Sequence, residues 1–235
     1  MLPILDKCIL AFDQGLRVLT DTALTAERVS PATHVDPHMD QHDDQDHDQC
    51  HDQKNITEEA MDALLSPEQR KKTAAYMRIN HAGEIAAQGL YHGQMFAARN
   101  DRLRAELQHA AKEEIDHLLW CKQRLKELEG HPSFFDPLWY VLSFKLGFLA
   151  GVLSDRLSLG LIAAVEQQVY RHLQEHITHI AVTDKKTRAI LQQMQQDELQ
   201  HRQHALDAGG FVFSATLQEW MFLSSRVMTK ISYYL

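Results

Sequence analysis

Apolar residues recur three and four positions apart over most of the chain, which is the spacing of one helix face. They alternate over no run long enough to predict a sheet. Helix signals stand where they are needed, with Ser66-Pro67 at a start and Gly130 and Gly209 after two ends. The fold class is therefore predicted to be all-α, with four long helices at 67–99, 101–129, 156–181 and 184–208.

Short links join these helices into two antiparallel hairpins, and the long connection 130–155 joins the hairpins into a four-helix bundle with one crossover. Within the crossover, 138–153 is apolar on nearly every side but spans only sixteen residues and contains Lys145. A bilayer-spanning helix needs about 20 apolar residues, so this segment is predicted to be either buried or docked in a membrane interface. Residues 217–234 predict a further amphipathic helix with Arg226 among its apolar positions.

Outside the bundle domain, placed at 56–235, residues 1–29 are predicted to hold a short amphipathic helix and residues 30–55 a His- and Asp-rich disordered linker. Seven aspartates in 36–52 account for most of the formal charge of −8. The remainder of the chain is nearly neutral, which indicates no nucleic-acid partner. Three scattered cysteines form no Cys-x-x-Cys pair, and they indicate free thiols in a reducing compartment.

Two copies of Glu-x-x-His are the most informative motif in the sequence, and each has one more Glu about thirty residues upstream. The gaps are 30 and 32 residues. Residues i and i+3 lie on one face of a helix, so each Glu and His can hold one metal ion or two adjacent ions. The full set comprises Glu84, Glu114 and His117 in the first half, and Glu166, Glu198 and His201 in the second.

Four carboxylates and two imidazoles suit a pair of iron or manganese ions better than one zinc ion, which normally takes four ligands. This inventory is that of ferritin-like di-iron bundles. A single Glu-x-x-His arises by chance on solvated helix faces, but two copies with matching upstream Glu residues are harder to explain that way. Glu84 and Glu166 also follow small and apolar residues, where an unpaired carboxylate would be costly to bury.

Each ligating histidine is expected to give its second ring N–H to an acceptor outside the metal. Asp116 directly precedes His117 and Asp197 directly precedes Glu198, but both aspartates are expected to point elsewhere on their helices and are not assigned this role. His172 and Tyr170 follow Glu166 by six and four residues, and both are candidates for a role near a substrate.

The same segments resemble the di-iron demethoxyubiquinone hydroxylase family of ubiquinone biosynthesis. The likeness lies in Tyr76–Gln88, with its Asn-His-Ala-Gly-Glu run, in Ala111–Leu118, in Gln195–His201 and in the Pro137–Tyr140 entry to the apolar crossover. It covers nearly all of 66–235. The resemblance implies a monooxygenase that uses O2 and two iron ions to hydroxylate the last unsubstituted ring carbon of a polyprenylated methoxy-methyl-benzoquinol, with the six residues above as ligands.

The resemblance also implies reduction by NADH, directly or through a quinone, without a flavin site. It further implies a peripheral place on the cytoplasmic face of the cell inner membrane among other ubiquinone-biosynthesis proteins, and is compatible with an oligomer. One departure is Leu173, where some relatives carry Tyr after the histidine. Segments 138–153 and 217–234 are expected to form one surface that docks on lipid and includes Phe144 and Phe148. The residues expected at headgroup depth are Trp139, Tyr140, Trp220 and Tyr233.

Two other classes of protein compete with this reading. A ferritin-like protein that oxidises or stores iron would use the same six ligands, but it would need neither the apolar crossover nor the amphipathic end. A non-catalytic membrane adaptor would use the Glu and His residues for packing alone. Metal content separates the adaptor from the other two, and a quinone extracted from purified protein would separate the hydroxylase from the iron-storage protein.

Overall fold

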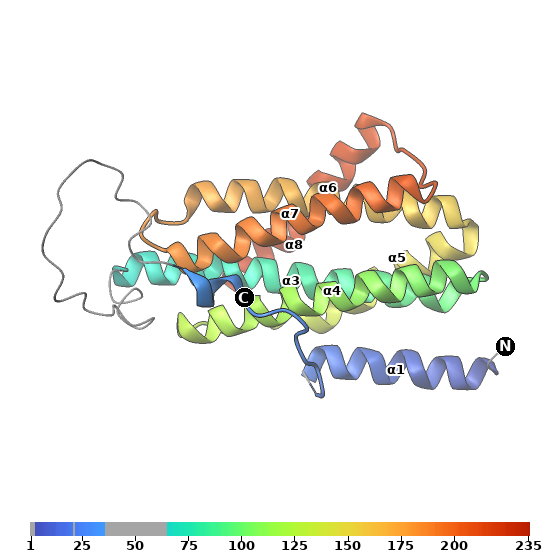
Figure 1. Ribbon diagram of the computed structural model, residues 1–235, viewed down its shortest axis with the longest axis horizontal. Helices are drawn as coiled ribbons and strands as arrows, with labels where there is room; N and C mark the ends of the chain where they lie inside the picture. The colour runs from blue at the N-terminus through green and yellow to red at the C-terminus, as the bar shows by residue number, and fades with distance from the viewer. Residues whose placement is uncertain (1–2, 21, 36–64) are drawn as a thin grey trace, which may run out of the picture.

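The computed structural model describes residues 3–20, 22–35 and 65–235 (Figure 1). Most of the expected His- and Asp-rich linker, from residue 36 onward, lies outside the described residues. The described part is helical and contains no strand, which confirms the predicted fold class. Its elements are α1 (Ile4–Thr20), the 3-10 helix η1 (Pro31–His34), α3 (Pro67–Ala97), α4 (Asp101–Glu127), α5 (Asp136–Leu153), α6 (Asp155–His179), α7 (Lys185–Asp207) and α8 (Ala215–Tyr234).

The helices from α3 onward begin and end within two residues of their predicted bounds. At the start of α3, Ser66 accepts from the Gln69 backbone N–H while the Gln69 side chain accepts from Ser66, a capping box with Pro67 at the first helical position. The end of α4 differs in detail from the expected glycine stop. Glu129, not Gly130, adopts positive φ, at 58°, and the Gly130 N–H bonds to Leu125.

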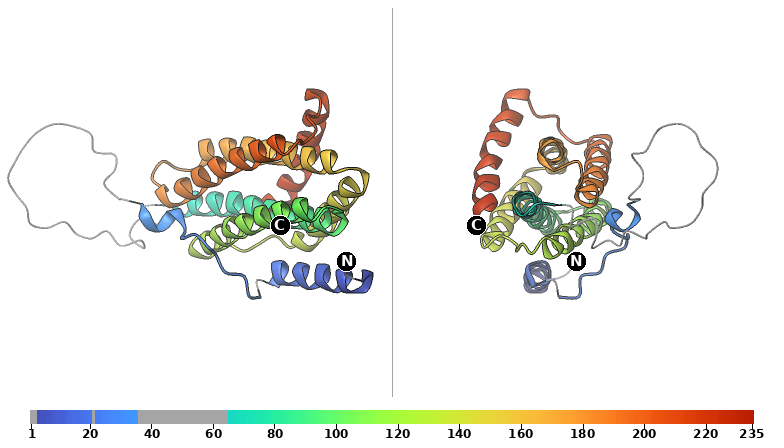
Figure 2. Two further views of the ribbon diagram at one scale, coloured as in Figure 1. Left: turned by 45° about the vertical axis from the view of Figure 1, so that its right-hand side comes forward. Right: turned by 90° about the vertical axis from the view of Figure 1, so that its left-hand side faces the viewer.

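Helices α3, α4, α6 and α7 form the bundle, seen end-on in the right-hand view of Figure 2. One apolar cluster fills one end of the bundle around Met77, Trp120 and Leu191. A second cluster lies toward the other end, around Tyr91 and Ile162. The polar ligand residues come from helix positions between these two clusters, where the burial of apolar surface fixes the four helices on either side.

Helix α5 packs against α3 through glycines on both helices. A Cβ on Gly93 would lie 2.0 Å from the Phe144 carbonyl oxygen, and one on Gly147 would lie 2.1 Å from that of Leu90. Gly89 and Gly151 extend this close approach by one turn in each direction. Small residues four apart on both partners let the two backbones approach closely, as in helix pairs within membranes. One side of α5 is therefore fixed to the bundle along its length.

This packing corrects the expected composition of the docking surface. Tyr140 is buried, and Phe144 and Phe148 are half-buried against Phe96 of α3. Because α5 is apolar on nearly every side, periodicity could not indicate which face packs inward. The outward face instead carries apolar side chains that are 42–58% exposed, namely Leu138, Val141, Leu142, Leu146, Leu149 and Val152. The expected exposure of Trp220 on α8 is found, at 68%.

The N-terminal segment lies outside the bundle and packs on it. Helix α1 runs beside α3 and α5, with Gly15 against the Tyr140 ring and Val18 in an apolar cluster with Ile85 (Figure 1). The chain then reaches η1, which packs on α7. Ser30 and Ala32 are buried there, so the first residues of the expected disordered linker are packed against the bundle.

Candidate metal centre

All six sequence-predicted ligands lie together in the centre of the bundle, and each is at most 7% exposed. The geometry follows from the topology, because the two hairpins bring four helices to one level along the axis. Helix α3 supplies Glu84 and α6 supplies Glu166. Helices α4 and α7 supply the two Glu-x-x-His pairs, Glu114 with His117 and Glu198 with His201.

The six residues form two overlapping groups of four, and within each group the ligand atoms lie within 4.8 Å of one another. Glu84 and His117 belong to the first group, and Glu166 and His201 belong to the second. Glu114 and Glu198 are shared by both groups, a pattern typical of two adjacent ions bridged by two carboxylates, each ion with one further Glu and one His.

Burial and the closeness of several carboxylates shift the pKa values of groups in the cluster. Burial raises the pKa of Glu84 well above its usual range, and the nearby Glu114 raises it further. Burial and the neighbouring Glu198 do the same for Glu166. Burial alone would lower the pKa of His117, but hydrogen bonds to Asp197 and Glu114 outweigh it and raise that pKa. The cluster therefore favours positive charge at its centre.

Buried polar atoms without a hydrogen-bond partner give an independent test of whether the cluster fits metal. Both carboxylate oxygens of Glu198 and Oε1 of Glu114 make no hydrogen bond of ordinary geometry. Their polar neighbours are the Nδ1 atoms of the two cluster histidines, with His201 Nδ1 2.8 Å from Glu114 Oε1 and His117 Nδ1 3.3 Å from Glu198 Oε1. Such oxygens are rare in folded proteins because burying an unpaired carboxylate oxygen is costly. They belong to the two residues that both groups share. Two divalent cations with nitrogen and oxygen preference would satisfy them, and the donor set is one that iron accepts.

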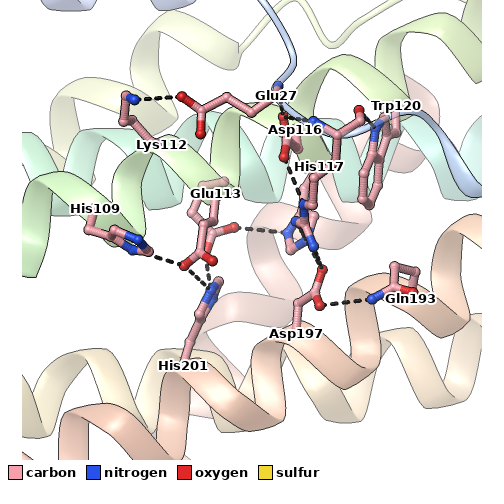
Figure 3. A network of polar contacts seen from close by, with 12 residues as sticks. Glu27, His109, Lys112, Glu113, Asp116, His117, Trp120, Gln193, Asp197 and His201 are labelled. Atoms are coloured by element: carbon pink, nitrogen blue, oxygen red, sulfur yellow. Dashed lines mark hydrogen bonds and ion pairs between the residues drawn. The ribbon is translucent and has the colours of Figure 1, made fainter.

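The outer ring nitrogens of both histidines meet a carboxylate from the opposite helix (Figure 3). His201 Nε2 lies 3.1 Å from Glu113 Oε2, and His117 Nε2 lies 2.9 Å from Asp197 Oδ2. Glu113 and Asp197 each directly precede a Glu of the cluster, so the arrangement is reciprocal. The expectation that Asp197 accepts no hydrogen bond from a cluster histidine was wrong. Asp197 makes no described hydrogen bond to His201 on its own helix, but it meets His117 on the facing helix α4.

Arg28 is the residue near the centre that the sequence analysis missed. Its Nε lies 2.8 Å from Asp116 Oδ2 and its Nη1 lies 2.7 Å from Asp197 Oδ2. Asp116 thus contacts the N-terminal segment and no ligand histidine in the described structure, as expected of it. No local pattern marks Arg28, which precedes these partners by 88 and 169 residues.

The two candidates for a role near a substrate, Tyr170 and His172, are not the residues that hydrogen-bond to the Glu166 carboxylate in the described structure. The hydroxyl that donates to Glu166 Oε1, at 2.8 Å, belongs to Tyr91 of α3. Tyr170 is half-buried, and its role stays a prediction. His172 faces α8, where its Nε2 lies 3.1 Å from the Ser225 hydroxyl and its ring stacks on Phe222.

Two cavities flank the centre. The larger, of about 670 Å³, lies between α4 and α7 and reaches Glu113, His201 and Tyr91. The smaller, of about 380 Å³, lies among α3, α6 and α8 and is lined by His172, Tyr76 and residues of α8. Only the larger of these two cavities is lined by a residue of the cluster, His201.

A helical bundle with this duplicated set of buried carboxylates and imidazoles defines a candidate carboxylate–histidine metal protein. Comparison with known proteins narrows the class. Residues 71–232 match the family model described as ubiquinone biosynthesis protein COQ7, and the chain belongs to that family.

Curated relatives agree with the family match. A protein named 3-demethoxyubiquinol 3-hydroxylase from Acinetobacter baumannii is 42% identical over 231 residues, which cover 98% of this chain and 97% of the relative. One of the same name from Ectopseudomonas mendocina is 44% identical, over 97% and 94%. A third, from Pseudomonas fluorescens, is 51% identical over 73% of this chain and 80% of its own length.

Proposed function

We propose that this chain is a 3-demethoxyubiquinol 3-hydroxylase, a monooxygenase with two iron ions. The name is that of the relatives described above, which are 42–51% identical to this chain. The observation that carries the proposal is the pair of shared carboxylates, Glu114 and Glu198, because three of their four buried oxygens make no hydrogen bond. Bound cations would satisfy these oxygens.

In this proposal Glu84 and His117 complete one iron position, and Glu166 and His201 complete the other. The two irons, when bound, supply the redox chemistry that activates O2. The polypeptide orients the side chains that would hold the metal and excludes water from them. Tyr91 holds Glu166 in place through its hydroxyl, and Asp197 and Glu113 fix the outward nitrogen of each imidazole so that the other nitrogen faces the centre. Deep burial of all six ligands keeps bulk water from a reactive centre.

The overall reaction balances with one further reductant. One oxygen atom of O2 enters the ring C–H bond and gives a hydroxyl, and the other leaves as water. Two electrons and two protons must come from outside the substrate bond. We propose NADH, directly or through a quinone, as their source.

We further propose that the protein binds to the cytoplasmic face of the inner membrane without spanning it. By length and composition α5 is apolar enough to cross a membrane, and 22% of its apolar window is buried. Its glycine contacts with α3, however, hold it against the bundle along its length. The outward leucines of α5, with Trp220, Leu223 and Val227 of α8, then offer an apolar face to lipid. A long isoprenoid tail would reach the centre from that side.

The deciding experiment is turnover with labelled oxygen. Protein loaded with iron is given demethoxyubiquinol, NADH and 18O2, and the product is analysed by mass spectrometry. The expected product carries one 18O atom on the ring. As controls, 16O2 with 18O-labelled water should leave the product unlabelled, and metal-stripped protein should give no product.

The outcomes separate the competing functions. Two irons per chain with oxidation of added ferrous iron but no quinol product would favour an iron-handling protein. Absence of bound metal would favour a packing role for the Glu and His residues. Either result would overturn the proposal.

A further inference from the structure

We propose that Arg28 is a positioning residue of the metal centre, by which the N-terminal segment 22–35 holds the ligand His117 through Asp197. The inference rests on the proposed two-metal site and adds to it a residue from outside the bundle. It predicts that Arg28 supports one of the two metal positions and not the other.

The first step is the bridge between two helices. Arg28 contacts Asp116 on α4 and Asp197 on α7 with different nitrogens of one guanidinium, at 2.8 and 2.7 Å. The side chains of these aspartates are only 2% and 10% exposed. Both carboxylates depend on this one guanidinium for charge compensation, because a buried carboxylate left without a cation is costly. A planar guanidinium can serve both carboxylates at once, and an ammonium group cannot do so with the same geometry.

The second step is the link from Asp197 to the metal ligand. The same oxygen, Asp197 Oδ2, accepts from Arg28 Nη1 and lies 2.9 Å from His117 Nε2. The other oxygen accepts from Gln193 at 2.9 Å, so the carboxylate is held at both ends. With Nε2 engaged outward, Nδ1 of His117 faces Glu114 and Glu198, at 3.1 and 3.3 Å. Arg28 Nη2 itself lies 3.4 Å from His117 Nε2, farther than the Asp197 oxygen, so the shorter link from Arg28 to His117 runs through Asp197.

The third step is the way the segment itself is fixed (Figure 3). Asp116 Oδ1 accepts from the Glu27 backbone N–H at 2.7 Å, and Trp120 Nε1 donates to the Arg28 carbonyl at 3.3 Å. The guanidinium lies over the Trp120 ring, 4.9 Å from its centroid. Main chain and side chain of Arg28 are thus both seated on α4, as a specific site for this residue requires.

The asymmetry makes the proposal sharp. His201 takes its outer acceptor from Glu113, which lies on α4 and makes no described hydrogen bond to Arg28. Loss of Arg28 should therefore weaken the position of His117 and Glu84 and spare that of His201 and Glu166. Removal of an outer partner of a ligand histidine typically costs 10–100-fold in metal affinity.

The test is the rate at which a ferrous chelator removes iron from anaerobic, iron-loaded protein. In Arg28→Met one of two ions should leave about 10- to 100-fold faster than in the unmodified protein, and the other at the normal rate. Arg28→Lys should fall between, and Asp197→Asn should match Arg28→Met. Glu113→Gln should speed the other ion. The control is Lys112→Met, which removes the exposed ion pair between Lys112 of α4 and Glu27 of the same segment.

If the Arg28 contacts only stabilise the fold, Arg28→Met should lower the melting temperature, and the two ions should be released at the same rate. Equal release of both ions in Arg28→Met, or release of both at the normal rate, overturns the proposal. If Arg28→Met does not fold, the same reading is taken from Arg28→Lys and Asp197→Asn. Unmodified protein that binds fewer than two ions would overturn the two-iron function itself, whereas a normal iron content with equal release overturns only the role of Arg28.

Discussion

At the scale of residues, some carboxylates of the centre belong to both groups of candidate ligands and others belong to only one. Glu114 and Glu198 belong to both groups of candidate ligands, whereas Glu84 belongs to one. The sequence could predict which six Glu and His residues gather at the centre, because their spacing places each of them on one face of a helix. The two Glu-x-x-His pairs also predict Glu114 and Glu198 as the bridging type of carboxylate, and these are the two that both groups share.

We expect Glu198→Ala to lose both metal ions and Glu84→Ala to lose one, because only the first removes a carboxylate shared by both positions. Hydroxylation should be abolished in both variants, with helix content retained. Metal analysis and far-ultraviolet circular dichroism measure the two quantities. Turnover with two irons in Glu198→Ala would contradict the assignment.

A second prediction at this scale concerns acid stability. Burial lowers the pKa of His92 from 6.5 to about 4, and its Nδ1 lies 2.7 Å from the Tyr140 hydroxyl. As pH falls below about 6.5 the unfolded chain takes up this proton before the folded protein does, so stability present above 6.5 is lost between 6.5 and about 4. Between pH 7 and pH 5 we expect a loss of roughly 2 kcal/mol from this residue.

Urea unfolding at several pH values tests this expectation. The free energy of unfolding of His92→Gln should fall less steeply with acid than that of the unmodified protein, and the difference cancels contributions from the metal ligands. His204→Gln, at an exposed position on α7, is the matched control and should keep the normal slope. An identical slope in His92→Gln would rule out this histidine as the source.

At the scale of elements, helix existence and bounds followed from the sequence, but the orientation of α5 did not. Its apolar residues surround the helix, so the pattern of apolar and polar positions does not distinguish the packed face from the exposed one. The glycines are the signal that could have done so. Gly89 and Gly93 on α3 match Gly147 and Gly151 on α5 in spacing, and both pairs mark a close backbone approach.

Gly93→Ala should destabilise the protein by about 3 kcal/mol, because the added methyl group meets the backbone of Phe144 and the two helices must separate. Gly83→Ala is the matched control on the same helix, since its methyl group meets nothing within 4 Å. That variant should be neutral or more stable by up to about 1 kcal/mol. Equal unfolding midpoints in urea for the two variants would show that the close approach is not needed.

At the scale of the whole molecule, α8 and the seam between α4 and α7 lie on opposite sides of the bundle (Figure 2, right). The seam side carries Arg28 and the larger cavity, while the exposed apolar residues of α8 face away from it. The sequence predicted apolar elements suited to lipid. It could not predict the bridge across the seam, because Arg28 meets its partners only after the N-terminal segment docks.

Leu149→Asp should weaken binding to vesicles by about tenfold or more, since it places a charge on the apolar face of α5. Turnover of a long-tail quinol should fall with it, while a short-tail analogue should be hydroxylated normally. Val182→Asp, in the exposed link between α6 and α7, is the control and should bind vesicles normally. Equal vesicle binding by the two variants, each with its fold intact, would argue against docking through α5.

The reciprocal placement of Glu113 and Asp197 bears on the order in which the protein matures during synthesis. A nascent chain that has completed only the α3–α4 hairpin holds three of the six ligands, yet the acceptor that orients His117 is still to be translated on α7. The second hairpin alone is equally incomplete, because the acceptor for His201 lies on α4. Neither hairpin alone therefore carries both a cluster histidine and the carboxylate that meets its outer nitrogen. In the proposed two-iron protein, binding of metal by oriented histidines would require the assembled bundle.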